Sequence, residues 1–213
     1  MTDNTDPPLD DRQRRVEAER KAGFAEDVAR EMRHRLKNQL AVVGSVSKLL
    51  ARHTDDAKEL VQKLEEKLIA LSHAQDLLTV HRDDPITSRD AIDQVLAASG
   101  AGDHIECLDI PDVTLGHDAV QQLALILNEL QTNSLKYGSL RDETGRITLS
   151  GSREGRSLSL VWHEDCDRPI EEPERHGAGT QLITRLGSTN DAAASFEWHP
   201  RAVTVTFHLR TLD

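Results

Sequence analysis

The stretch VAREMRHRLKNQLAVVGSVSKLL, residues 28–50, predicts a long amphipathic helix. Its apolar residues recur at intervals that are mostly three or four, which places them along one side of a helix. The spacing extends outward from about Arg12 to residue 52, and beyond Arg12 no proline occurs before Pro85. The apolar stripe consists of Val16, Phe24, Val28, Met32, Leu36, Leu40, Val43 and Leu50.

A second helix is expected after a polar break at residues 53–56, where Thr54 or Asp55 can serve as its N-cap. We predict that the two helices form an antiparallel hairpin over residues 12–82, after a solvated acidic tail at residues 1–11. Because two helices alone cannot enclose a core, such a hairpin usually pairs with a second copy into a four-helix bundle. The sequence therefore predicts a homodimer. The stripe of the second helix consists of Leu60, Leu64, Leu68, Leu71 and Leu78.

The rest of the chain, residues 86–213, has a pattern that predicts an α+β domain, a sheet half covered by helices. A polar stretch that ends in Pro85 separates it from the hairpin. We expect a charged, mobile lid at residues 165–179, where no apolar pattern repeats. Helices are expected at about 88–98 and 117–137, a short strand at 105–110, and antiparallel strands around the alternating apolar residues at 147–149, 158–162, 196–198 and 203–209.

Composition excludes several classes of protein. The 213 residues carry 26 Lys and Arg against 37 Asp and Glu, and no basic, aromatic-rich segment offsets this, so we expect no nucleic-acid partner. No run approaches the roughly 18 apolar residues of a membrane span, and the acidic start is unlike a signal peptide. We therefore expect a soluble, cytoplasmic protein with no membrane span. Its only cysteines, Cys107 and Cys166, are too few for a disulfide framework and are expected to be reduced thiols.

The first candidate for chemistry is an exposed histidine in the long helix. His34 lies two residues from both Met32 and Leu36, so it points about 200° away from the apolar stripe. A neutral imidazole among cations can accept a phosphoryl group, because the cations neutralise the transferred charge. A surface histidine without a function is the alternative. The side chains expected around His34 are Glu31, Arg35, Lys37 and Asn38.

The second candidate is a polar stripe on the helix expected at 117–137. Glu129, Asn133 and Lys136 fall at i, i+4 and i+7, so a carboxylate, an amide and a cation align along one side. The oxygens of Glu129 and Asn133 can hold Mg²⁺ together with water, and Lys136 can meet a phosphate. Any surface helix can show such a stripe by chance.

The third candidate is the turn Gly177-Ala178-Gly179-Thr180, immediately before a helical stretch from Gln181 to Leu186. Glycines at a helix N-terminus let backbone N–H groups approach phosphate oxygens. A G-x-G pattern alone is often only a turn. Its position where the expected lid ends favours a ligand site.

Four blocks together resemble bacterial histidine kinases of the HWE family, over roughly residues 24–210. They are HRLKN at 34–38, NELQTNSLKYGSL at 128–140, WHE at 162–164 and GAGTQLI at 177–183. The resemblance implies a dimerising phosphoacceptor hairpin followed by an ATP-binding α/β sandwich of the GHKL type. It also implies ATP and Mg²⁺ as cofactors and a response-regulator receiver domain as partner.

The same resemblance implies roles for individual residues. His34 matches the phosphoaccepting histidine. Asn133 matches the Mg²⁺-coordinating asparagine, and Glu164 matches the acidic residue that takes the exocyclic amine of adenine. The ATP lid corresponds to residues 165–176. The other nucleotide-facing positions are Glu129, Lys136 and Tyr137 on the helix of Asn133, and Gly177, Gly179 and Thr180 against the triphosphate.

Three departures from the family pattern keep a second class of function open. Asn128 stands where the family has histidine, residues 166–168 (Cys-Asp-Arg) stand where Gly-Gly-Pro is common, and residues 188–194 replace a Leu-Gly-Gly. The alternative is a non-enzymatic, dimeric histidine phosphotransferase whose sandwich has lost ATP, and a scaffold without phosphoryl chemistry is a third. No more than about twenty residues precede the hairpin, which leaves no room for a sensory domain, so we expect a separate sensor protein as partner.

Overall fold

The structure is a computed structural model that describes residues 9–80, 85–99, 104–141, 145–174, 176–189 and 191–212. It contains two compact units, of which the first ends at Ser45 and the second begins at Val46. The expected α+β class is confirmed, with long helices followed by a mixed sheet. The expected domain boundary at residues 83–85 stays a prediction, because residues 81–84 lie outside the described part of the chain.

The long helix forms as predicted. Helix α1 (Leu9–His53) has 45 residues. It begins earlier than expected, since residues 9–11, assigned to the tail, are helical. Acidic residues are favourable in a first helical turn, which explains this start. Residues 1–8 of the expected tail lie outside the described residues. Four stripe residues of α1 are exposed: Phe24, Met32, Leu36 and Leu40.

Helix α2 (Ala57–Val80) is capped by Asp56, and the expectation of Thr54 or Asp55 was wrong. The Asp56 carboxylate accepts hydrogen bonds from the backbone N–H of Lys58 at 2.7 Å and of Glu59 at 2.9 Å. These are the second and third residues of the helix, the amides that an N-cap side chain normally satisfies. The helix therefore begins one or two residues later than the sequence signal placed it.

The second unit contains a five-stranded sheet in the order β2-β4-β5-β7-β6. β2 runs parallel to β4, and the other neighbours are antiparallel. Trp162 pairs with Leu149 on one side and with Val205 on the other, which sets the register of the three central strands. The strands are β2 (Ile105–Leu108), β4 (Arg146–Glu154), β5 (Ser157–Asp165), β6 (Ser195–His199) and β7 (Ala202–Arg210).

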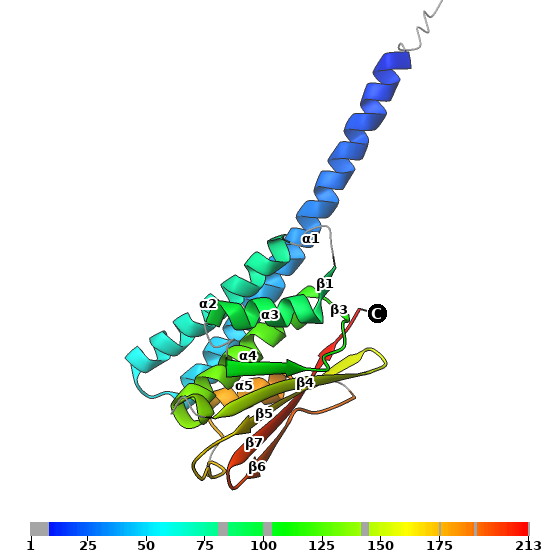
Figure 1. The fold of residues 1–213 in the computed structure, drawn as a ribbon. Coiled ribbons are helices and arrows are strands. Elements are labelled where there is room, and N and C mark those ends of the chain that lie inside the picture. The colour runs from blue at the N-terminus through cyan, green and yellow to red at the C-terminus, as the bar shows by residue number, and fades with distance from the viewer. Residues whose placement is uncertain are drawn as a thin grey trace, which may run out of the picture. The chain divides into compact units, whose positions relative to one another are not determined.

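Helices cover one face of this sheet, as Figure 1 shows. They are α3 (Ser88–Ser99), α4 (His117–Tyr137) and α5 (Ala178–Leu186), and a 3-10 turn, η2 (Ser139–Arg141), follows α4. A two-stranded sheet of β1 (Ile86–Thr87) and β3 (Thr114–Leu115) was not predicted, because strands of two residues leave no periodic signal. The core under the helices includes Trp162, Phe207, Leu149, Leu160, Leu123 and Ile126.

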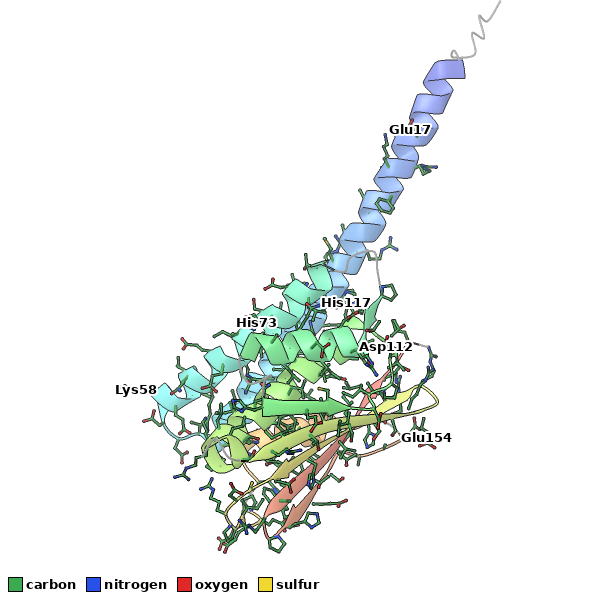
Figure 2. All side chains as sticks on the ribbon, in the orientation of Figure 1. Glu17, Lys58, His73, Asp112, His117 and Glu154 are labelled. Atoms are coloured by element: carbon green, nitrogen blue, oxygen red, sulfur yellow. The ribbon has the colours of Figure 1, made fainter. Side chains whose placement is uncertain are left out.

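The second half of α2 belongs to the same core. Ala74, Leu77 and Leu78 are buried among the residues that line the sheet and α4. Away from this core, α2 carries exposed polar side chains such as Lys58 and His73 (Figure 2). Among the helices that the structure describes, none is apolar enough over a sufficient length to cross a membrane.

Candidate functional site

A cavity of about 550 Å³ opens beside α4 in the second unit. Every nucleotide-facing residue expected from the sequence lines it, although these residues come from three separate stretches of the chain. Strands β6 and β7 add an apolar side to the cavity, and α2 adds charged side chains. The expected residues in the lining are Glu129, Asn133, Lys136, Tyr137, Glu164, Gly177, Gly179 and Thr180.

Helix α4 places its polar stripe in the cavity because its other side is fixed in the core. Leu123 and Leu127 are fully buried, so the helix cannot rotate without exposing them. Glu129 is buried and Asn133 is half-buried, whereas Lys136 at the end of the helix is exposed. The stripe therefore runs from a buried carboxylate to a solvent-facing cation.

A buried ion pair fixes Glu129 from outside α4. The ammonium of Lys67 on α2 lies 2.8 Å from Glu129 Oε1, and it also donates a hydrogen bond to Asn128 Oδ1. Sequence reasoning missed Lys67. The available signal was its position, since Lys67 lies three residues after Leu64 and four before Leu71 and so interrupts the apolar stripe of α2.

The carboxylate of Glu164 is buried at the wall of the cavity and held by donors on both oxygens. The hydroxyl of Ser134 donates to Oε2 at 2.6 Å, and the backbone N–H of Ser139 donates to Oε1 at 2.5 Å. The indole N–H of Trp162 lies 3.4 Å from Oε2. Each carboxylate oxygen has two lone pairs, so Glu164 keeps capacity for a further donor from a ligand.

Gly138 leaves the space that Glu164 occupies, so Gly138→Ala is expected to destabilise the fold. A Cβ at this position would lie 1.8 Å from Glu164 Oε1 and 2.9 Å from the Cα of Ser134. Overpacking of this kind costs about 1–3 kcal/mol in the free energy of unfolding, which urea denaturation measures. Gly23→Ala is the control, because a Cβ there meets nothing within 4 Å. Equal loss, or no loss, in the two variants would contradict the contact.

Helix α5 begins at Ala178, earlier than the expected stretch from Gln181, so Gly179 and Thr180 lie in its first turn. Gly177 is the N-cap in an extended conformation. A Cβ at Gly179 would lie 2.5 Å from Glu129 Oε2, so a larger residue here would force the Glu129 carboxylate to shift. The first N–H groups of a helix have no partner inside the helix, and here they are available beside the cavity.

The segment at residues 166–168 is tied to the rest of the domain. Arg168 donates to the backbone carbonyl of Tyr137 at 2.8 Å, and Arg201 Nε donates to the carbonyl of Cys166 at 3.4 Å. Burial, together with the nearby Glu164 carboxylate, raises the pKa of the Cys166 thiol to about 11. The thiol therefore stays protonated near neutral pH and meets the cavity as a small, uncharged group.

His34 is exposed on α1, as its position off the apolar stripe predicted. Lys37 is exposed and Asn38 is half-buried. The side chains of Glu31 and Arg35 lie outside what the structure describes, so their predicted place around His34 stays a prediction.

The donor set at α4 fits Mg²⁺. Within the described ranges, no group of three or more His, Cys, Asp and Glu side chains could hold a metal ion. Magnesium, however, commonly binds through one or two protein oxygens and completes its shell with water and phosphate. Glu129 and Asn133 line the same cavity and can supply such oxygens.

Comparison with known proteins agrees with the resemblance found in the sequence. The family described as HWE histidine kinase matches residues 31–107. A blue-light-activated histidine kinase of Brucella anthropi is 33% identical over 162 residues, which are 73% of this chain and 33% of the relative. Blue-light-activated histidine kinase 1 of Erythrobacter litoralis is 40% identical over 76 residues, 34% of this chain and 21% of the relative. The chain thus spans a third or less of the length of these relatives.

Solved structures show the same fold. A blue-light-activated histidine kinase of Erythrobacter litoralis superposes with a TM-score of 0.60 at 18% identity, over 83% of this chain and 60% of that chain. The histidine kinase domain of that protein gives a TM-score of 0.52 at 16% identity, over 80% of this chain and 95% of that chain. These solved structures show the fold, and the family match together with the Brucella anthropi relative shows that the chain belongs to the HWE family of histidine kinases.

Proposed function

We propose that this chain is an ATP-dependent histidine kinase that phosphorylates His34 and passes the phosphoryl group to an aspartate of a response-regulator receiver domain. One observation carries the proposal most strongly. A single cavity gathers a carboxylate, an amide, a cation and a helix N-terminus from α4 and α5, the groups that hold a metal ion and phosphates.

The phosphate end of the cavity is assigned to α4 and α5. Lys136 and the backbone N–H groups at Gly179 and Thr180 bind phosphate oxygens, and Glu129 and Asn133 hold Mg²⁺. ATP, when bound, supplies the phosphoryl group. Positioning and charge neutralisation provide most of the catalysis in phosphoryl transfer, and these residues supply both.

The base end is assigned to Glu164. Ser134 and Ser139 hold its carboxylate in one orientation, and its remaining lone pairs accept a hydrogen bond from the exocyclic amine of adenine. Trp162, Phe196 and Val205 give this part of the cavity apolar walls, which suit the faces of a purine.

His34 is assigned the role of nucleophile. An exposed imidazole on a helix can attack with its neutral ring nitrogen, so a nitrogen–phosphorus bond forms as the bond to the leaving phosphate oxygen breaks. Lys37 beside it neutralises part of the charge that arrives with the phosphoryl group.

Both cysteines are free thiols, which supports a reducing, cytoplasmic location.

A histidine phosphotransferase without ATP is the second candidate. Two observations favour it: the Cys166 side chain lines the cavity where the family commonly has glycine, and Lys67 already pairs with Glu129. In this alternative, His34 receives its phosphoryl group from another protein.

Incubation of the protein with Mg²⁺ and γ-labelled ATP tests the proposal. A kinase acquires label that is lost in acid and kept in base, because phosphohistidine is acid-labile. Absence of label, combined with transfer from an already phosphorylated receiver domain, would overturn the kinase in favour of the phosphotransferase.

We further propose that the protein is a homodimer through the apolar stripes of both α1 and α2, and Leu40→Asp is expected to yield monomers or aggregates. Leu36 and Leu40 are 55% and 62% exposed in the single chain. Burying a leucine is worth about 1.5–3 kcal/mol, so a second copy that covers these side chains would gain this free energy. Sedimentation at micromolar concentration measures the mass. Ala41→Asp is the control, since Ala41 is exposed but lies off the stripe. A folded monomer of the unmutated protein would contradict the dimer.

A further inference from the structure

Lys67 is a buried cation from the hairpin helix α2 in the cavity that the nucleotide is proposed to occupy. It is 2% exposed and lines the cavity together with Glu129 and Asn133. Its ammonium lies 2.8 Å from Glu129 Oε1 and donates to Asn128 Oδ1. Lysine is almost never fully buried unless it is paired, so this contact accounts for its position.

The second carboxylate oxygen of Glu129, Oε2, lies on the side of α5, away from Lys67. A Cβ built on Gly179 would lie 2.5 Å from Glu129 Oε2 and 3.7 Å from the amide nitrogen of Asn133. Glu129 therefore stands between an ammonium on α2 and the first turn of α5. One carboxylate is shared by an internal cation and by the part of the cavity where a metal ion would bind.

The Lys67 ammonium beside Glu129 opposes the binding of a divalent metal ion to the same carboxylate. Lys67 neutralises Glu129 and lowers the electrostatic gain that a divalent ion obtains from the carboxylate. It also repels that ion directly, and charges a few ångströms apart interact strongly in a protein interior. Removal of Lys67 would leave Glu129 buried without a counter-ion, a costly state that a metal ion relieves.

We propose that Lys67 is a positioning residue of the nucleotide site, which acts as the resident counter-ion of Glu129 and competes with the divalent cation for this carboxylate. The role deepens the proposed function and rests on it for the identity of the ligand. Because the linkage is reciprocal, a bound cation weakens the ion pair between α2 and α4 by the same factor by which the pair weakens cation binding.

Binding of Mn²⁺ alone, without nucleotide, tests this role on the full chain. Electron paramagnetic resonance of free Mn²⁺ gives the dissociation constant. Lys67→Met is expected to bind Mn²⁺ at least about tenfold more tightly than the parent. The substitution removes the repulsion between the Lys67 ammonium and the Mn²⁺ ion. At the effective dielectric constant of a protein, this repulsion changes the dissociation constant by more than a factor of about ten. The double variant Lys67→Met with Glu129→Gln is expected to lose this gain, since its carboxylate is gone.

Lys63→Met is the matched control. Lys63 lies one turn earlier on α2 and also lines the cavity, but it pairs with Glu59 at 2.7 Å rather than with Glu129. Its Mn²⁺ affinity is expected to stay within about twofold of the parent, as for other partly exposed pairs. Lys67→Gln, which keeps a donor for Asn128, replaces Lys67→Met should that variant not fold.

Two results would overturn the role of Lys67: equal Mn²⁺ affinity in the parent and the Lys67 variant, or a gain that persists without the Glu129 carboxylate. Neither result depends on ATP. A protein that gains Mn²⁺ affinity on loss of Lys67 but fails to acquire label from ATP would contradict the kinase while supporting the ion-pair role.

Discussion

His34→Ala is expected to remove all acid-labile label from the protein after incubation with Mg²⁺ and γ-labelled ATP. The reason is chemical: His34 combines exposure, a nucleophilic nitrogen and the neighbouring cation Lys37, and it stands in the HRLKN block that resembles the phosphoacceptor segment of the family. Truncation on the exposed side of α1 leaves the apolar stripe intact, so helicity and sedimentation should match the parent.

His73→Ala is the control for this prediction. His73 is also an exposed histidine on a long helix, as Figure 2 shows, and its loss should leave labelling unchanged. Label that persists without His34, or that maps by peptide mass to another of the ten histidines, would contradict the assignment.

Asn133→Ala is expected to weaken binding of a non-hydrolysable Mg·ATP analogue by roughly 10- to 100-fold. Hydrogen bonds to charged groups are worth about 1.5–3 kcal/mol, and 1.36 kcal/mol corresponds to a factor of ten. Asn133 is half-buried in the cavity and does not contribute to the core, so the fold should survive. Calorimetric titration measures the affinity.

Gln122→Ala is the control for Asn133→Ala, since Gln122 is a half-buried polar residue of the same helix away from the cavity. No detectable heat in the parent at millimolar analogue would contradict ATP binding. The variant with Cys166→Gly and Asp167→Gly then decides between the two functions. If the variant gives a heat of binding with the analogue, the nucleotide site of the parent is crowded. If the variant also gives no heat of binding, the phosphotransferase is favoured.

The sequence predicted α4 with its observed bounds because its apolar residues repeat with the helical period and Gly116 and Gly138 flank it. The central strands followed from strict alternation, as at Leu158, Leu160 and Trp162. Periodicity reports which side of an element is buried, so it places the candidate residues on their elements.

Contacts between elements were beyond this reasoning. Neither the pairing of Lys67 with Glu129 nor the approach of Gly179 to Glu129 leaves a local pattern, because the partners are distant in sequence. Asn128 illustrates the difference. The sequence shows only that it departs from the family pattern, whereas the structure gives its side chain a partner, the Lys67 ammonium.

The connection between β5 and β7 has a consequence for how the site can evolve. These strands pair over nine residues, from Ser157 with Arg210 to Asp165 with Ala202, while residues 166–177 of the lid lie in the connection between them. Loop-closure entropy grows slowly with length, by about 0.6 kcal/mol for each doubling. Insertions in the lid after residues 166–168, which are tied to the domain, therefore cost the sheet little, and ligand preference can drift while the fold stays stable.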